Sequence, residues 1–440
     1  MSGWAQYSRL HARHRRPRTA DAARLLALRQ GPLRVRGGRP RPRRRHLHPR
    51  GRHRRRSRPA QALRAAHPRR PPQWSRSLRG RHQAGRGAVR AGGLGVIPTP
   101  PRLRGRTLAA IDAAILWRIG LVRPSPSRGT APPPAEPTAF WAESRAATPV
   151  PLEVRRRGTS ENGVRVLDLS GDSGGPGGHP GSRRFAGRAR IRSSAFEAPL
   201  VLLLHGYAAP LPTYEDWHAW RLLRRGAHAA RIDLPFHLSR RVPGQRSGDG
   251  FFSTDLDHDR VVFRQAVEDA ASVVAWARRE VTSRVAVLGF SLGGLVACLL
   301  AAVVPLDAVV AVTPPCDLAD TMLERCPGRI RRQLGLVGGS GGPWGADAAA
   351  ARGVLDSALA PVTPRLLHPV TDPARTTVVC AEYDGIVGAG PVRQLAAAWG
   401  AELLEYRQGH ISVMSARGIS RRLHDRLLRT TPVTAPAAAV

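Results

Sequence analysis

The chain has 440 residues, 42% of them hydrophobic, and a formal net charge of +39. The charge is uneven: residues 1–100 hold 28 arginines and one acid, Asp21, whereas residues 101–440 hold 42 arginines and 30 acids. The composition excludes a wholly disordered chain, and the absence of a long uncharged apolar run excludes a transmembrane helix. The longest apolar run near the N-terminus, Leu25–Leu28, is too short for a signal peptide, so we expect a cytoplasmic protein.

Residues 1–95 are rich in arginine, proline, glycine and histidine and show no periodic apolar pattern. We expect them to be disordered, because they offer too little apolar surface to offset the entropy lost on ordering. Three interpretations stay open: a start site assigned too far upstream, a specific regulatory segment, or a solvated arm whose arginines bind nucleic acid. No nucleic-acid-binding motif with a defined geometry is present, and aromatic residues are too sparse for base stacking.

Residues 96–148 are expected to hold one amphipathic helix and a linker. The apolar positions at helical spacing are Leu108, Ile111, Ile115, Ile119 and Val122, with Asp112 and Arg118 elsewhere on the helical wheel. Such a helix docks on the following domain or lies on a membrane surface, and docking is the interpretation we favour. A proline-rich linker extends from Arg123 to about Pro137.

Residues 149–430 alternate strand and helix patterns, which predicts an α/β fold with a mostly parallel sheet and flanking helices. Strands are predicted at Leu152–Arg156, Gly163–Leu169, Phe185–Ile191, Leu200–Leu204, Ala229–Asp233, Val285–Leu288, Ala308–Val312, Thr377–Cys380 and Glu402–Tyr406. Helices are predicted at Trp217–Arg225, Val261–Arg279, Leu292–Val303, Val392–Trp399 and Ile419–Leu428. Residues 315–370 interrupt this alternation and are expected to form a small helical cap, and residues 431–440 a flexible tail.

The segment around Ser291 carries the strongest chemical signal. It reads Gly289-Phe290-Ser291-Leu292-Gly293, preceded by an apolar strand and followed by an apolar helix. This is the context of a nucleophile elbow, in which a tight strand-to-helix turn exposes the serine and glycines give it room. The N–H of Leu292 at the helix N-terminus would then stabilise a developing oxyanion.

A serine hydroxyl needs a base and an acid, and in this fold they follow the nucleophile in the order acid, then histidine. Asp384 follows the predicted strand Thr377–Cys380, and His410 follows the predicted strand Glu402–Tyr406. Both loops should lie at the sheet edge that carries Ser291, so we predict Asp384 and His410 as its partners. Asp317 is the alternative acid, with Glu382 a weaker one.

These motifs, together with His205-Gly206 after the strand Leu200–Leu204, occur in an order that resembles the α/β-hydrolase superfamily over about residues 150–430. The resemblance implies an α/β-hydrolase fold, a second oxyanion donor from the N–H of Tyr207, and a structural role for His205. The segment that begins at Asp233 is similar to a poorly characterised bacterial subgroup.

Three side chains that follow Asp233 are expected near the mouth of the site: His237, Arg240 and Arg241. They either bind an acidic group of the substrate or only shape the loop, and both interpretations stay open.

A second serine motif competes with the elbow. Residues 171–176 read Gly-Asp-Ser-Gly-Gly-Pro, which matches the nucleophile segment of trypsin-like proteases. That fold needs a histidine and an aspartate upstream in an all-β domain, whereas the upstream chain is mostly the arginine-rich tail. We therefore interpret Ser173 as part of a glycine-rich loop.

We expect a serine hydrolase that cleaves a carboxylic ester or thioester of a small acyl substrate through an acyl-enzyme. No metal or organic cofactor is expected, since the four cysteines have no metal-ligand spacing. Two alternatives remain: a nucleic-acid-binding protein acting through the tail, and a catalytically silent hydrolase fold used for binding. The oligomeric state stays open.

Overall fold

The computed structural model describes residues 105–119, 131–159, 163–173, 182–193 and 197–429. They all belong to the second of two compact units, residues 88–440. The predicted tails at residues 1–95 and 431–440 lie outside the described residues, and the boundaries proposed for them stay predictions. No helix in these described ranges is long and apolar enough to cross a membrane.

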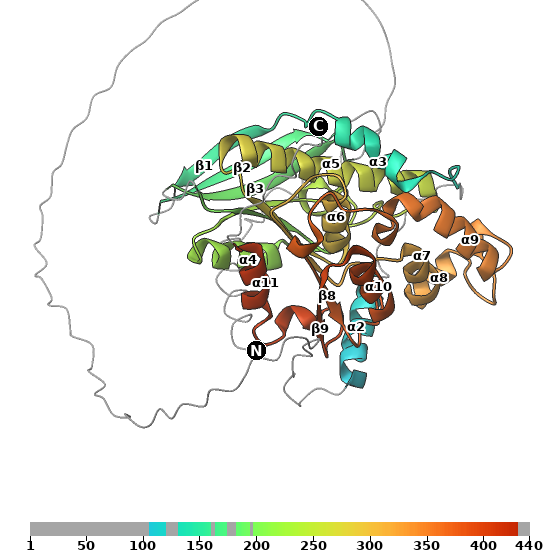
Figure 1. Cartoon of the computed structure of the whole chain (residues 1–440). Helices are drawn as coiled ribbons and strands as arrows, with labels where there is room; N and C mark the ends of the chain where they lie inside the picture. Colours follow the sequence, from blue (N-terminus) through green and yellow to red (C-terminus); the bar gives the residue numbers. More distant parts are fainter. Residues whose placement is uncertain (1–104, 120–130, 160–162, 174–181, 194–196, 430–440) are drawn as a thin grey trace, which may run out of the picture. The chain divides into compact units, whose positions relative to one another are not determined.

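A nine-stranded sheet forms the centre of the unit (Figure 1), with the strand order β1-β2-β3-β5-β4-β6-β7-β8-β9. The strands are β1 (Glu153–Thr159), β2 (Val164–Asp172), β3 (Arg184–Arg192), β4 (Leu200–Leu204), β5 (His228–Ile232), β6 (Val285–Phe290), β7 (Ala308–Val312), β8 (Thr376–Ala381) and β9 (Glu402–Tyr406). The first three strands pair antiparallel, and β3 also pairs antiparallel with β5, whereas β5, β4 and β6 to β9 are all parallel. The predicted mostly parallel α/β sheet is confirmed, and every predicted strand is present.

The parallel strands are buried on both faces, which explains their continuous apolar sequences. Leu200, Leu202 and Leu204 of β4 point into one core, and Val201 and Leu203 point into the other. The main helices that cover the sheet are α4 (Thr213–Arg224), α5 (Leu256–Glu280), α6 (Leu292–Ala301), α10 (Ala389–Trp399) and α11 (Ile419–Leu427). Side chains of α5, α6 and α10 fill the first core, and those of α4 and α11 fill the second.

Between β7 and β8 the chain forms short helices, as expected for residues 315–370. They include α7 (Leu318–Asp320), α8 (Gly328–Gln333) and α9 (Ala348–Leu359), joined by single helical turns. Leu355 and Leu359 of α9 are buried in the first core. The insertion therefore packs on the sheet domain, and its role as a cap over the site stays a prediction.

A helix that the sequence reasoning did not predict, α3 (Pro137–Ala146), lies where only the end of a linker was expected. Glu136 caps its N-terminus by accepting hydrogen bonds from the first-turn amides of Thr138 and Ala139. Trp141 is fully buried and donates from Nε1 to the carbonyl of Pro361 at 2.7 Å. This helix is too short to show a clear apolar stripe in the sequence.

The predicted amphipathic helix forms as α2 (Gly105–Ile119), but its buried face differs from the prediction. Leu108 is buried as expected, whereas Ile111 is 38% exposed. Asp112, which was assigned to another face, is fully buried. Leu108 and Asp112 are four residues apart and so share one face of the helix. The docked face of α2 therefore carries a carboxylate.

Candidate active site

Ser291 lies in a sharp turn between β6 and α6, with φ 52° and ψ −118°. A positive φ is unfavourable for serine and persists only where the surrounding structure enforces it. The turn leaves no space for side chains at two neighbouring positions: a Cβ on Gly289 would lie 2.0 Å from the carbonyl oxygen of Gly293, and a Cβ on Gly293 would lie 2.2 Å from that of Leu204. Both flanking glycines are thus required, as the elbow motif predicts.

The structure brings together the three side chains predicted to form a triad. His410 Nε2 lies 2.9 Å from Ser291 Oγ, and His410 Nδ1 lies 2.8 Å from Asp384 Oδ2. Ser291 follows β6, Asp384 follows β8 and His410 follows β9, so all three lie at the carboxyl edge of the parallel strands. All three residues are buried. This chain of hydrogen bonds is the arrangement that activates a serine hydroxyl.

Asp384 is held rigidly by its own loop. Its Oδ1 accepts hydrogen bonds from the amides of Ile386 at 2.8 Å and Val387 at 2.9 Å, which leaves Oδ2 facing His410. Burial raises the pKa of Asp384, but the neighbouring His410 and the two amide hydrogen bonds together outweigh burial, so the pKa is lowered overall. The carboxylate is therefore ionised at neutral pH, as an orienting acid requires.

The alternative acids are engaged elsewhere. Asp317 caps α7 by accepting from the amide of Asp320 at 2.8 Å, and its other oxygen pairs with Arg352 at 2.8 Å. Glu382 pairs with Arg407 at 3.2 Å. Asp384 alone of the three candidates contacts His410 in the described structure.

Two amides were predicted to stabilise the oxyanion, those of Leu292 and Tyr207. The N–H of Leu292 is the first of α6, and the first four amides of a helix have no partner within the helix. The loop after β4 passes beside the nucleophile, since a Cβ on Gly206 would lie 3.5 Å from the Cβ of Ser291. The amide of Tyr207 follows directly in this loop. Its role as second donor stays a prediction.

His205 and His237 fix the loops beside the nucleophile. His205 Nδ1 donates to the carbonyl of Gly206 and its Nε2 accepts from the amide of Leu234. Similarly, His237 Nδ1 donates to the carbonyl of Pro235 at 2.7 Å and its Nε2 accepts from the amide of Ala208 at 3.1 Å.

Both nitrogens of each of these rings are therefore in use. Burial lowers the pKa of both imidazoles, that of His237 well below its usual value. The structure thus makes His237 a neutral brace that joins the loops after β4 and β5, and leaves neither ring nitrogen for a substrate.

Arg240 is buried in a polar network away from solvent. It pairs with Asp269 at 2.7 Å and also donates to the hydroxyl of Ser173 and to the hydroxyl and carbonyl of Ser182. Its donors are thus consumed within the fold, which opposes the expectation that it binds substrate. Arg241 is exposed, and its guanidinium donates to the carbonyl of Leu238 at 3.2 Å. Of the three expected substrate contacts, only Arg241 is open to solvent.

Ser173, the serine of the protease-like motif, directly follows β2 and lies inside the same network. Its hydroxyl donates to Asp269 at 2.7 Å and accepts from Arg240 at 2.9 Å. No histidine contacts it among the described residues. This arrangement gives Ser173 a structural role.

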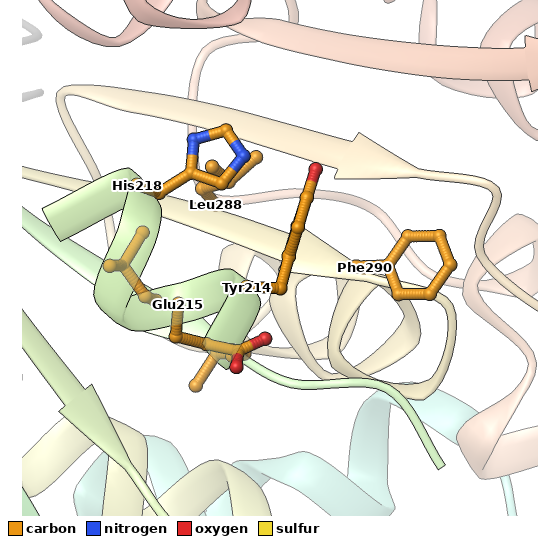
Figure 2. Close-up of a pocket in the computed structure, with 7 residues that line it drawn as sticks. Tyr214, Glu215, His218, Leu288 and Phe290 are labelled. Atoms are coloured by element: carbon orange, nitrogen blue, oxygen red, sulfur yellow. The ribbon is translucent and has the colours of Figure 1, made fainter. Parts of the chain in front are cut away.

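A small, closely packed cavity with no space for a water molecule lies next to the nucleophile strand (Figure 2). Tyr214, Glu215 and His218 of α4 face Leu288 and Phe290 of β6 across it. Burial raises the pKa of Glu215 to about 7. None of the three triad residues lines this cavity, so it is separate from the chemistry at the sheet edge.

Among the described residues, no group of three or more histidine, cysteine or acidic side chains is placed to hold a metal ion. All four cysteines are free, and Cys298, Cys316 and Cys380 are buried.

Comparison with known proteins agrees with this fold. Residues 197–355 match the profile of the X-Pro dipeptidyl-peptidase (S15) family, a span that includes β4, the elbow and α6. The fold is similar to that of acetyl xylan esterase 1 from Thermoanaerobacterium sp. JW/SL YS485. That similarity has 17% identity and a TM-score of 0.51, and covers 71% of this chain and 98% of the esterase.

The chain has the α/β-hydrolase fold. An acetyl xylan esterase from Paenibacillus sp. R4 is also similar, with 16% identity and a TM-score of 0.49, over 70% of this chain and 98% of that one. No curated protein is similar enough to count as a match. The prediction of an α/β-hydrolase fold is confirmed, and the prediction of a hydrolase enzyme agrees with the family match.

One residue of the site was missed by the sequence reasoning. Asp112 of α2 accepts hydrogen bonds from the amides of Gly385, His410 and Ile411 at 3.2, 2.8 and 3.3 Å. The available signal was its position four residues after Leu108 on a helix otherwise poor in charge. A single acid in that position is more often a solvated residue, so periodicity alone could not find it.

Replacing Arg240 tests whether it binds substrate or holds the fold. Arg240→Ala leaves Asp269 buried without a counter-charge, so we expect the free energy of unfolding to fall by about 3–5 kcal/mol. The matched variant Arg241→Ala removes an exposed guanidinium and should change the free energy of unfolding by less than about 0.5 kcal/mol. Denaturant unfolding measures both. Unchanged stability in Arg240→Ala together with a raised KM would return Arg240 to the substrate site.

Proposed function

We propose that the protein is a serine hydrolase that cleaves a carboxylic ester or thioester of a small acyl substrate through an acyl-enzyme. The observation that carries the proposal is the hydrogen-bonded sequence Asp384–His410–Ser291, with both distances below 3 Å, at a strained elbow. An imidazole positioned between a serine and a carboxylate can accept the serine proton.

In the first half of the reaction, Ser291 Oγ attacks the acyl carbon as His410 Nε2 takes its proton. Asp384 keeps the Nδ1 proton of His410 in place and stabilises the imidazolium that forms. The amides of Leu292 and Tyr207 would donate to the negative oxygen of the tetrahedral intermediate. His410 then protonates the leaving alkoxide or thiolate, which leaves the acyl group on Ser291.

In the second half, a water molecule repeats these steps on the acyl-enzyme. His410 takes a proton from the water, and the resulting intermediate collapses with Ser291 as the leaving group. Each proton moves through the same imidazole, so no group beyond these residues and water is required.

The geometry supports this proposal over a silent hydrolase fold. A fold retained only for binding has no need of a serine with positive φ or of a buried carboxylate directed at the histidine. Strain and buried charge are costly features that persist where they serve a reaction. Nucleic-acid binding would depend on the arginine-rich tail, which lies outside the described residues.

The choice of bond is open to a direct comparison. The matched family is named for a peptidase of X-Pro substrates, whereas the two similar structures are named as acetyl xylan esterases. We assign the ester class, because the fold is similar to that of an acetyl xylan esterase over 98% of that enzyme. Turnover of an X-Pro anilide that exceeds turnover of p-nitrophenyl acetate would assign the peptidase activity instead.

A cytoplasmic location is also part of the proposal. It is supported by four free cysteines, since thiols persist in reducing compartments. Burial raises the pKa of Cys298 and Cys380 to about 12, so these thiols are unreactive packing groups.

Ser291→Ala removes the proposed nucleophile. We expect kcat for p-nitrophenyl acetate to fall by a factor on the order of 10⁶, since loss of one triad member abolishes the joint action of all three. The fold should persist, as a smaller side chain fits the turn. Ser173→Ala is the matched control and should keep wild-type turnover. Near-normal turnover in Ser291→Ala, or a large loss only in Ser173→Ala, would contradict the assignment.

Two further variants separate the candidate acids. Asp384→Asn should lower kcat by about 10⁴-fold, because the amide favours the wrong tautomer of His410. Asp317→Ala removes a helix cap and should cost about 1 kcal/mol of stability while turnover is kept. Steady-state kinetics and the unfolding midpoint of both variants provide the comparison. Loss of turnover at Asp317 with retention at Asp384 would move the acid to the loop after β7.

A further inference from the structure

We propose that Asp112 of α2 is a positioning residue for the triad. It joins the loop that carries Asp384 to the loop that carries His410 and so fixes the imidazole between acid and nucleophile. The inference rests on the proposed function, because it assigns Asp112 a role in the reaction of Ser291.

The carboxylate of Asp112 bridges the two loops through backbone amides. Its Oδ2 accepts from the amide of Gly385 at 3.2 Å and from that of His410 at 2.8 Å, and its Oδ1 accepts from Ile411 at 3.3 Å. Gly385 is next to the acid, and His410 is the base itself. Oδ2 of Asp112 therefore contacts one loop next to the catalytic acid and the other loop at the catalytic histidine itself.

The bridge is buried and closely fitted. Asp112 has no exposed surface, and its two carboxyl oxygens accept three main-chain hydrogen bonds. A Cβ on Gly409 would lie 2.7 Å from Asp112 Oδ2, so only glycine lets the loop approach this closely. The loop before His410 is thus shaped around the carboxylate.

The carboxylate comes from a helix that precedes all strands of the sheet in the sequence. α2 ends at Ile119, 34 residues before β1 begins at Glu153, and it docks through Leu108 and Asp112. The backbone joins these two loops where the amide of Tyr383 donates to the carbonyl of Gln408 at 2.9 Å, but the amides of Gly385 and His410 are both donors and cannot bond each other. A carboxylate acceptor between them is a simple way to hold these two loops together.

The position of the imidazole is what this bridge controls. The Asp112 oxygen bonds the main-chain nitrogen of His410, while the side chain of His410 makes the two triad bonds. Displacement of that main chain moves both ring nitrogens away from their partners. A misplacement of about 1 Å in a catalytic group costs on the order of 10² in rate.

Loss of the Asp112 carboxylate should therefore lower kcat. Asp112→Ala removes all three hydrogen bonds, and we expect kcat to fall about 10²-fold while KM changes by less than about threefold. The rate constant for inactivation by a fluorophosphonate should fall in parallel, because that reaction needs the same activated serine.

Asp112→Asn provides a graded variant that keeps the shape of the side chain. Its single oxygen can occupy the Oδ2 position and accept from Gly385 and His410, whereas its NH₂ group cannot accept from Ile411. We expect a loss of about tenfold in kcat, the equivalent of one hydrogen bond, and therefore partial rescue relative to alanine. If Asp112→Ala fails to fold, Asp112→Asn still tests the proposal.

Two control variants separate positioning from stability. Ile111→Ala changes an exposed neighbour on the same helix and should leave kcat unchanged. Trp141→Phe, on α3, removes the buried hydrogen bond to the carbonyl of Pro361, so it should lower the unfolding midpoint without lowering kcat. All variants are made in the full chain and compared at a temperature where each is folded.

The outcomes distinguish the two proposals. If the wild-type chain neither turns over the ester nor reacts with the fluorophosphonate, the proposed function fails and this inference fails with it. If the wild-type chain reacts but Asp112→Ala and Asp112→Asn keep kcat within twofold, the inference alone is wrong. A kcat loss in Trp141→Phe equal to that in the Asp112 variants would also overturn it.

Discussion

The site depends on the hydrogen bond between His410 Nε2 and Ser291 Oγ, because it forms only if two loops from separate strands meet within 3 Å. The parallel pairing of β6 to β9 supplies the coarse alignment by bringing the carboxyl ends of these strands to one edge. The strained turn at Ser291 then directs the hydroxyl toward the histidine. The parallel strands bring the loops to one edge of the sheet, and the local backbone geometry then places the hydroxyl of Ser291 within hydrogen-bond distance of His410.

Buried carboxylates complete that alignment. Asp384 and Asp112 each accept main-chain amides from the loops at this edge, and each is shielded from water. The neutral rings of His205 and His237 brace the loops on the other side of the nucleophile through backbone groups. The loops around the serine are therefore fixed by polar contacts to the backbone, whereas the two apolar cores fix the sheet and its helices.

Much of this architecture could be predicted from the sequence. The continuous apolar runs marked the buried parallel strands, and the glycines around Ser291 marked the elbow, because both patterns reflect local constraints. The acid and the base were accessible because they follow strands that must end at the same edge. Asp384 was preferred to Asp317 on chain order, and the structure places it against His410.

The remaining features depend on contacts between distant segments. The helical wheel of α2 could not show that Asp112 is buried, since its three amide partners lie some 270 to 300 residues further along the chain. Arg240 was expected to be at the mouth of the site because its loop follows β5, but Asp269 on α5 neutralises it in the interior. Pairing of this kind leaves no periodic signal in a single sequence.

The most direct test of the account is to identify the residue that reacts with diethyl p-nitrophenyl phosphate. This reagent phosphorylates an activated serine and releases p-nitrophenol, and trypsin cleavage followed by mass spectrometry locates the product. The account predicts one diethylphosphoryl group per chain, on the peptide of residues 285–325, whose one serine is Ser291. Modification of the peptide of residues 166–183, which contains Ser173, or ester hydrolysis that survives an excess of the reagent, would contradict it.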